Sequence, residues 1–227
     1  SRQHAPDAVR DRGFVNYPTM FTSKSIDFLE QLLDTPGPSG FEGPPAKIWR
    51  AEASKFAEVT ADVAGNSMAV VNPGGSPTIM LAGHSDEIGV IVTYIDDDGY
   101  AYIAPIGGWD PQVLVGQRIR FAGRHGDVIG VVGKIPAHII RPEDREKGAR
   151  MRDLWVDIGA RDKKESMTMM SVGDSGVIDA RAIELPNSRL VSRSIDNRIG
   201  AFTVLEALRR YAERPGKAKV VAVATAP

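Results

Sequence analysis

Apolar residues at the N-terminal end of the chain recur with the spacing of helices. The segment SKSIDFLEQLLDT, which starts at Ser23, has a serine cap followed by apolar residues on one helix face. Prolines and glycines then interrupt the pattern at PGPSGFEGPP. We expect a second helix to start near Pro44 and Pro45, because proline fits the first turn of a helix, and to carry AKIWRAEASKFA.

From Val59 onward the pattern is that of strands. EVTADVAGNSMAVV predicts a hairpin that turns at Gly65 and Asn66, and TIMLAGH predicts a short apolar strand of the kind found at the centre of an α/β sheet. Residues from about Ile88 to Pro186 form a series of short strands separated by turns, with one charged loop, RPEDREKGARM. Evenly spaced short strands are typical of a small barrel or sandwich.

The α/β pattern returns after this β block. SRLVSRSIDNR leads into a helical run, IGAFTVLEALRRYAE, and KVVAVATAP is again an apolar strand of the central type. We therefore predict an α/β fold that is incomplete and is interrupted by an inserted all-β domain. The expected divisions are a polar extension at 1–24, a first α/β part at 25–87, the β insert at 88–187 and a second α/β part at 188–227.

Composition narrows the class of protein. The balance of 42% hydrophobic and 25% charged residues is that of a soluble globular chain, and the net charge of -1 argues against nucleic acid or a membrane surface as a partner. The apolar runs are shorter than the roughly 20 residues that span a bilayer. The chain has no cysteine, which excludes thiolate metal sites and cysteine nucleophiles and fits a reducing, cytoplasmic compartment.

The stretch AGHSDEIGV places His84, Asp86 and Glu87 at the end of a predicted strand, where open α/β sheets bind their ligands. His84 and Asp86 are two residues apart, so their side chains point the same way in an extended chain, whereas Glu87 points elsewhere. An aspartate beside a metal-binding imidazole accepts the other ring N–H and fixes the tautomer. A lone histidine at a strand end is nevertheless more often a structural residue than a metal ligand.

SIDNR is the second candidate, because Asp196 lies between an apolar stretch and the start of a helix. One interpretation is an N-cap, in which the carboxylate accepts hydrogen bonds from first-turn amides. The other is a carboxylate that bridges two metal ions. The sequence contains no G-x-S-x-G motif, no P-loop and no H-E-x-x-H motif.

Five segments, in order, resemble the tetrahedral dinuclear metallo-aminopeptidases of metallopeptidase family 42. They are TPGPSGFE, AGHSDEIG, IAPIGGWDPQVLVGQRI, DLWVDIGA and SIDNRIGAFTVLEAL. These enzymes are glutamyl- or leucyl-type aminopeptidases, and some are described as endoglucanases. The resemblance runs from about Ser25 onward. It implies a phosphorylase/hydrolase-like α/β catalytic domain interrupted by a PDZ-like β barrel that drives dimerisation, with dimers that assemble into tetrahedral dodecamers.

The resemblance also implies roles for single residues. His84 corresponds to a ligand of one metal ion, Asp86 to the carboxylate that orients His84, and Asp196 to the carboxylate that bridges two metal ions. The peptide bond between Asp196 and Asn197 is a place to expect a cis conformation. The cofactors would be two divalent ions, zinc or cobalt first and manganese second, and the reaction would remove N-terminal residues from peptides through a metal-activated water.

The resemblance departs from the family at the end of the sequence. In the family, the strand that matches KVVAVATA runs into a Glu-Glu pair, which supplies the general base and a metal ligand, and a later Asp and His complete the metal sphere. These positions are absent up to Pro227. We therefore expect this chain alone to bind metal weakly and to lack peptidase activity.

Other functions are compatible with the same residues. The chain could be one half of a split enzyme that needs a second chain, or an oligomerisation or regulatory subunit that acts through its β insert. Glycoside hydrolysis by paired carboxylates, Asp86 with Glu87 or with Asp196, is a further alternative. It leaves His84 without a role, and sensitivity to a chelator would distinguish it from a metallopeptidase.

Overall fold

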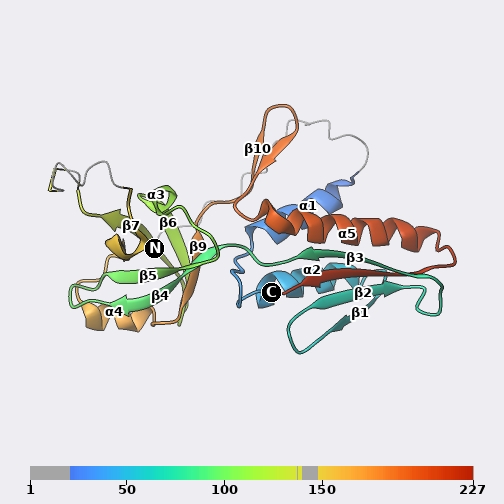
Figure 1. Ribbon diagram of the computed structural model, residues 1–227, viewed down its shortest axis with the longest axis horizontal. Helices are drawn as coiled ribbons and strands as arrows, with labels where there is room; N and C mark the ends of the chain where they lie inside the picture. The colour runs from blue at the N-terminus through green and yellow to red at the C-terminus, as the bar shows by residue number, and fades with distance from the viewer. Residues whose placement is uncertain (1–20, 137, 140–147, 227) are drawn as a thin grey trace, which may run out of the picture.

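A computed structural model describes residues 21–136, 138–139 and 148–226 and shows an α/β part joined to a closed β barrel (Figure 1). The expected fold class, an α/β fold with an inserted all-β domain, is confirmed. Residues 1–20 of the predicted polar extension and residues 141–147 of the predicted charged loop lie outside the described residues.

The α/β part contains a four-stranded sheet in the order β1-β2-β12-β3. Its strands are β1 (Glu58–Ala61), β2 (Ser67–Val71), β3 (Thr78–His84) and β12 (Lys219–Thr225). β12 runs antiparallel to β2 and parallel to β3. A strand from the far end of the sequence therefore separates two strands that are close together in the chain.

This order corrects one prediction. The TIMLAGH strand, β3, was expected at the centre of the sheet, but it lies at the edge of the sheet formed by the described residues. The central place is taken by β12, as its apolar sequence predicted. Alternation of side chains along β3 does not reveal which strand will pair with it, because pairing depends on the partner's sequence as much as on its own.

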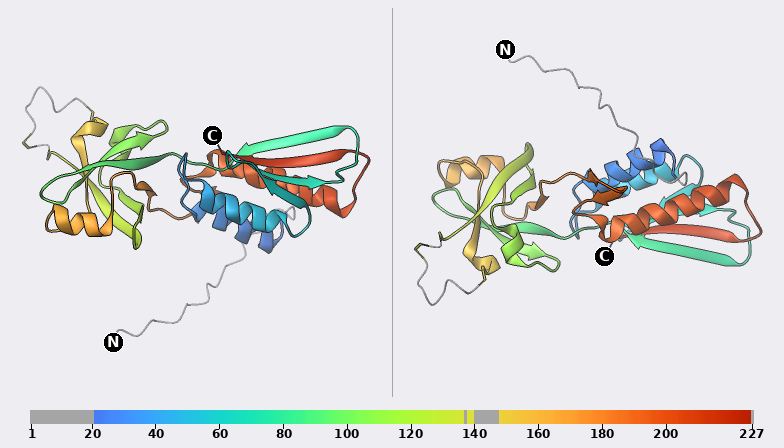
Figure 2. Two further views of the ribbon diagram at one scale, coloured as in Figure 1. Left: turned by 90° about the horizontal axis from the view of Figure 1, so that it is seen from below. Right: turned by 90° about the horizontal axis from the view of Figure 1, so that it is seen from above.

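Three helices pack on one face of the sheet (Figure 2). They are α1 (Ser23–Asp34), α2 (Gly43–Ala53) and α5 (Ile195–Glu213). The first helix is capped by Thr22, whose hydroxyl accepts from Ser25 N, and not by the serine that the sequence suggested. The shared core is built from large buried side chains, chiefly Phe28, Leu32, Leu33, Trp49, Phe202, Leu205 and Leu208.

No helix among the described residues covers the other face of the sheet, which we call the open face. Side chains alternate between the two faces along each strand, and Gly83 of β3 lies against α5, so Met80 points away from the helices. Met80 is 68% exposed. Following the strand register, the apolar residues of the open face are Met68, Val70, Met80, Ala82, Val221 and Val223.

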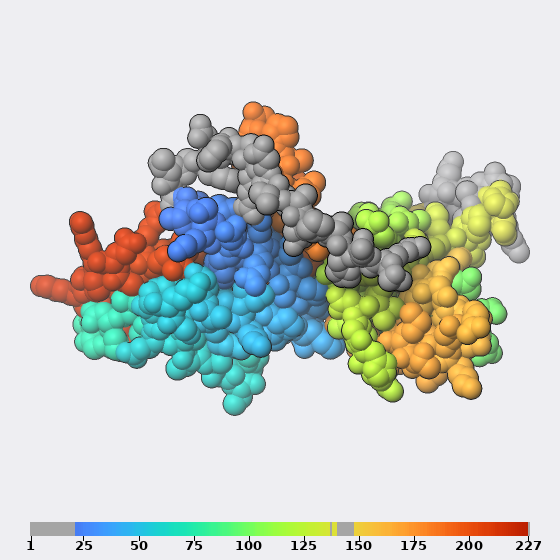
Figure 3. Space-filling view, turned by 180° about the vertical axis from the view of Figure 1, so that it is seen from behind, coloured from blue at the N-terminus to red at the C-terminus, as the bar shows by residue number. Residues whose placement is uncertain are grey.

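The barrel follows directly after β3 and has the strand order β4-β5-β8-β7-β6-β9. Its strands are β4 (Gly89–Ile95), β5 (Ala101–Ile106), β6 (Arg118–Gly123), β7 (Gly126–Lys134), β8 (Leu154–Asp157) and β9 (Ser175–Ile178). Short helices α3 (Pro111–Leu114) and α4 (Lys163–Met169) and a 3-10 turn, η2 (Met151–Asp153), connect them. The space-filling view shows the barrel and the α/β part as two lobes (Figure 3).

A hairpin that the sequence did not predict lies on the return path from the barrel. Strands β10 (Ile183–Leu185) and β11 (Arg189–Val191) project beside the helices (Figure 1). Asn187 and Ser188 form its tip with positive φ angles. The predicted division at 187/188 falls at this tip. After the hairpin the chain reaches α5 and re-enters the α/β part.

Candidate active site

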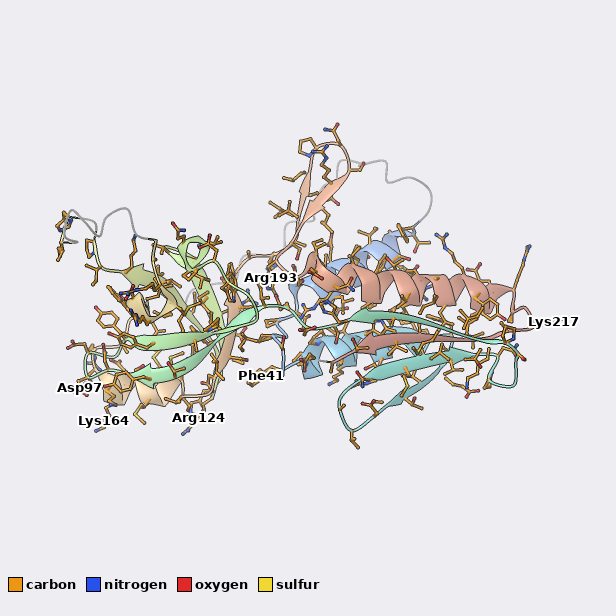
Figure 4. All side chains as sticks on the ribbon, in the orientation of Figure 1. Phe41, Asp97, Arg124, Lys164, Arg193 and Lys217 are labelled. Atoms are coloured by element: carbon orange, nitrogen blue, oxygen red, sulfur yellow. The ribbon has the colours of Figure 1, made fainter. Side chains whose placement is uncertain are left out.

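The candidate site lies where the chain leaves the α/β part for the barrel and returns. His84 is the last residue of β3 and is paired in register with Thr225, so the parallel strands β3 and β12 end side by side. Asp196 lies at the start of α5, just after the return. In Figure 4 the labels Arg193 and Phe41 mark this junction between the two lobes. The site is therefore at the carboxyl end of parallel strands, the usual position in α/β folds.

The three predicted site residues meet although Asp196 is far from the others in sequence. His84 Nδ1 lies 2.7 Å from Asp86 Oδ1, and His84 Nε2 lies 3.3 Å from Asp196 Oδ1. Ser39 Oγ donates to the second oxygen of Asp86 at 2.5 Å. The Asp196 side chain is 95% exposed, whereas that of Asp86 is 13% exposed. Asp86 is thus held from two sides, and Asp196 faces solvent.

These contacts define the chemistry of the histidine. When the Nδ1 proton is donated to Asp86, Nε2 carries a lone pair directed at the Asp196 carboxylate. Two acceptors that face each other at this distance repel unless a proton or a cation lies between them. His84 and Asp196 therefore have the chemistry of a pair that holds a cation, and the contact with Asp86 fixes the orientation of the ring.

The start of α5 is irregular at Asp196. The bond between Asp196 and Asn197 is a cis peptide, as the resemblance suggested, and both residues have non-helical backbone angles. The capping contact to Gly200 N is accepted by Asn197 Oδ1 at 3.1 Å. Asn197 therefore takes the capping role that had been one interpretation of Asp196, which leaves the Asp196 carboxylate free to face His84.

Glu87 belongs to a separate buried cluster. Its carboxylate is 2% exposed, accepts from Gly37 N at 3.1 Å, and pairs with Arg193 Nε at 2.8 Å and Arg198 Nη2 at 3.1 Å. Burial raises the pKa of Glu87, although the charges of Arg198 and Arg193 act in the opposite direction. Burial likewise lowers the pKa of the Arg198 guanidinium. The Glu87 carboxylate is thus engaged by the two arginines and by Gly37, and not by His84 or Asp86.

Sequence reasoning missed the two arginines. Arg193 and Arg198 flank Asp196, and both would be read as exposed residues because arginine is rarely buried. The one signal was position: Arg198 follows Asp196 by two residues and stands just before the apolar run of α5. A charged residue there is compatible with burial only if a carboxylate and carbonyl groups meet it.

The donors of the site suit metal binding in kind but are few in number. His84 and Asp196 offer an imidazole nitrogen and a carboxylate oxygen, which are preferred by zinc, cobalt and manganese. In the part of the chain that the structure describes, no group of three or more His, Cys, Asp or Glu side chains is arranged to hold a metal ion. Two donors are fewer than a tightly held zinc ion requires.

Comparison with known proteins identifies the same class as the five sequence segments. The family model of the M42 glutamyl aminopeptidases matches residues 65–227. The lysyl aminopeptidase of Pyrococcus furiosus is 32% identical over 201 residues, a match that covers 86% of this chain and 58% of that protein.

Two solved structures are similar in fold. The TET aminopeptidase from a marine sediment archaeon of the Thaumarchaeota superposes with a TM-score of 0.85 at 35% identity and covers 89% of this chain and 59% of its own. The TET1 peptidase of Pyrococcus horikoshii, described as assembling into a tetrahedron or a large octahedral shell, gives 0.80 at 27% identity, covering 89% of this chain and 61% of its own. This chain thus spans about three fifths of these relatives.

Within the described ranges, none of the helices combines the length and the apolar character needed to cross a bilayer.

Proposed function

The chain belongs to the M42 glutamyl aminopeptidase family, and we propose that it carries part of the active site of a metal-dependent aminopeptidase. The observation that supports this best is the arrangement of His84, which has Asp86 on one ring nitrogen and Asp196 on the other. Relatives with aminopeptidase names cover most of this chain. The match covers about three fifths of the length of these relatives.

In this proposal His84 is a ligand of one metal ion, Asp196 offers one carboxylate oxygen to each of two ions, and Asp86 is the orienting carboxylate. Zinc or cobalt, with manganese as an alternative, would polarise the scissile carbonyl of a peptide and lower the pKa of a shared water. Asp86 keeps the proton of His84 on Nδ1, so that Nε2 stays free to bind. Ser39 fixes Asp86 in turn.

Cobalt binding tests the site without reference to turnover. We expect Co²⁺ to bind the chain weakly and His84→Ala to reduce the affinity by more than the roughly 10–100-fold that loss of a supporting group costs, because His84 would be a direct ligand. His125→Ala is the matched control, since His125 is exposed in the turn between β6 and β7. Equal affinities for the wild-type chain and His84→Ala, measured by titration calorimetry, would remove the main support for the proposal.

We also propose that the isolated chain lacks peptidase activity, because its described residues provide two candidate metal donors and no carboxylate placed as a general base. The pure chain, supplied with Co²⁺ or Zn²⁺, should not hydrolyse an aminoacyl-p-nitroanilide above background. Robust turnover that a chelator abolishes would contradict this expectation but support the metallopeptidase assignment. Turnover of a glucan insensitive to chelator would support glycoside hydrolysis instead.

The geometry argues against a glycoside hydrolase that uses Asp86 with Glu87. Both oxygens of Asp86 are engaged, by His84 and Ser39, and Glu87 is buried between two arginines. Both carboxylates are thus already engaged by protein groups. Asp196 is exposed but would need a second free carboxylate.

We propose further that a polypeptide segment covers the open face and the free edge of β3. An apolar sheet face and an unpaired edge strand both favour association. The relatives are longer than this chain, so the missing part of such a protein, or a separate chain equivalent to it, is the occupant we propose. Co-expression with the unmatched part of the sediment archaeon's aminopeptidase should give a stable complex. A chain that stays monomeric in sedimentation velocity and forms no such complex would contradict this.

We propose homo-oligomers formed through the barrel, on the basis of the assembly described for the TET1 peptidase. Ile129 and Val131 of β7 are 43% and 48% exposed on the outside of the barrel and supply an apolar contact surface. Ile129→Lys should lower the sedimentation coefficient, whereas Thr93→Lys, which places the same charge at another exposed barrel position, should not. The absence of cysteine supports a cytoplasmic, reducing location for the whole protein.

A further inference from the structure

Arg198 connects the separate segments that build the candidate site. Its side chain is 0% exposed, although it carries a charge. Nε donates to the carbonyl of Ser85 at 2.8 Å, and the two terminal nitrogens donate to the carbonyls of Leu32, Thr35 and Gly37. One of these nitrogens also contacts Glu87 Oε1 at 3.1 Å. The guanidinium thus meets four carbonyl groups and one carboxylate.

These carbonyl groups belong to the chain segments that carry or support the candidate site residues. Ser85 stands between His84 and Asp86, so Arg198 holds the backbone from which both side chains project. Gly37 belongs to the loop that brings Ser39 to Asp86. Arg198 itself follows Asp196 by two residues. One side chain therefore joins the strand end with His84, the loop that supports Asp86, and the helix start with Asp196.

We propose that Arg198 is a positioning residue, which sets the distance between His84 Nε2 and Asp196 Oδ1 across the two crossings between the lobes. This inference rests on the proposed metal site. It is not a role in direct ligation, because Arg198 is buried behind the backbone and its nitrogens are occupied by protein acceptors. Loss of the contact would let the helix start move relative to the strand end.

The surroundings fit an arginine and no other cation. The planar guanidinium offers five donors in a fixed fork, whereas lysine offers three donors from a single nitrogen and cannot meet acceptors spread over two separate stretches of the chain. Glu87 compensates the buried charge. Gly37 leaves the space required, because a Cβ there would lie 2.8 Å from an Arg198 nitrogen and 2.5 Å from the Pro45 ring.

A matched control exists in the same helix. Arg209 of α5 is also held by ionic contacts, with its Nε 2.9 Å from Glu206 Oε1 and Nη2 2.6 Å from Glu52 Oε1. These partners lie on α5 and α2, and none belongs to the candidate site. Arg209→Lys should disturb the α/β part without changing the segments around His84 and Asp196.

The test compares Arg198→Lys with Arg209→Lys in the full 227-residue chain. We expect Arg198→Lys to lower Co²⁺ affinity by about 10–100-fold, the usual effect of losing a group that supports a ligand, and to change the visible spectrum of the bound Co²⁺. Arg209→Lys should stay within about twofold of the wild-type affinity. Affinity and spectrum unchanged in a folded Arg198→Lys variant would overturn the inference.

A second readout requires no metal. Hydrogen exchange of backbone amides at residues 84–87 and 195–198 should accelerate in Arg198→Lys and stay unchanged in Arg209→Lys. If His84→Ala has no effect on Co²⁺ binding, the metal site fails, and this exchange measurement still decides whether Arg198 holds the two segments together. Unchanged exchange at both segments counts against the inference whatever the metal result.

If Arg198→Lys does not fold, the variant Glu87→Gln tests the same inference. Glutamine keeps an acceptor oxygen beside Arg198 and removes the charge that compensates it. Because charge-assisted hydrogen bonds are stronger than neutral ones, we expect a loss of Co²⁺ affinity of up to about tenfold and faster exchange at residues 84–87. Wild-type affinity and exchange in Glu87→Gln would contradict the inference.

Discussion

The barrel and the α/β part differ in how their hydrophobic cores are covered. Every barrel strand has a neighbour on both sides, so the barrel has no free edge, and its core, around Phe121 and Leu154, is closed by its own strands. The sheet of the α/β part has helices on one face, an open apolar face on the other, and β3 unpaired along one side within the described residues. Within the described residues, the barrel thus encloses its core with its own strands, whereas the α/β part leaves one sheet face and one strand edge uncovered.

The difference also explains where the candidate chemistry lies. The barrel supplies none of His84, Asp86 and Asp196, which all come from the ends of α/β elements. In a closed barrel every strand is paired on both sides. The carboxyl ends of a parallel pair of strands, in contrast, place side chains around a shared space. The candidate site therefore lies on the lobe whose sheet has a free edge within the described residues.

The largest expected effect tests whether the barrel is independent. Phe121→Ala removes a fully buried ring and should lower the free energy of unfolding of the barrel by about 3–5 kcal/mol. In urea denaturation, the barrel transition should shift while that of the α/β part stays in place. Phe202→Ala, in the core of the α/β part, should do the reverse. Transitions that move together in both variants would show one cooperative unit and break the comparison.

A smaller effect tests the open face. Met80→Lys places a charge on the exposed side of β3 and should weaken the complex with the co-expressed complementing segment, while changing the free energy of unfolding by less than about 0.5 kcal/mol. Leu81→Lys is the neighbouring control, because Leu81 packs against the helix-side core and should lose more than about 2 kcal/mol. Sedimentation velocity and urea denaturation measure the two quantities. Unchanged association in Met80→Lys would contradict the proposed role of this face.

The smallest expected effect concerns pH and the α/β core. Burial alone raises the pKa of Glu52, but hydrogen bonds from Lys55 and Arg209 outweigh it and bring the pKa below the ordinary value of 4.5. The contribution of Glu52 to stability is therefore present above pH 4.5 and is lost as the pH falls through the lower pKa of the folded state. Glu52→Gln should flatten this part of the pH profile of urea midpoints. An identical profile in wild type and variant would exclude Glu52 as its cause.

The sequence predicted the elements of the fold well and their pairing less well. Helices α1, α2 and α5 and the β insert follow from periodicity and turn residues, which are local properties. The edge position of β3 could not be read from TIMLAGH, because it depends on β12, which is more than half the chain away. The hairpin of β10 and β11 was missed because its strands are short and mostly exposed.

The candidate site was predictable in part for a similar reason. His84 and Asp86 share a strand end, and the pairing of His84 with Asp196 came from the resemblance and not from any local pattern. Arg198 was missed because burial of a charge is decided by tertiary acceptors, here carbonyl groups of residues 32–37 and of Ser85. Asn197, and not Asp196, proved to cap the helix, a choice that depends on backbone angles which composition does not reveal.

The central position of β12 has a consequence for the order in which the two lobes can fold during translation. All strands of the barrel lie between residues 89 and 178, so the barrel can be completed as soon as they have emerged. β2 and β3 emerge earlier but have no strand between them until β12, the last strand described, leaves the exit tunnel. During synthesis the barrel can therefore be folded while the α/β sheet is still incomplete. The edge of β3 stays without its native partner until β12 has been synthesised.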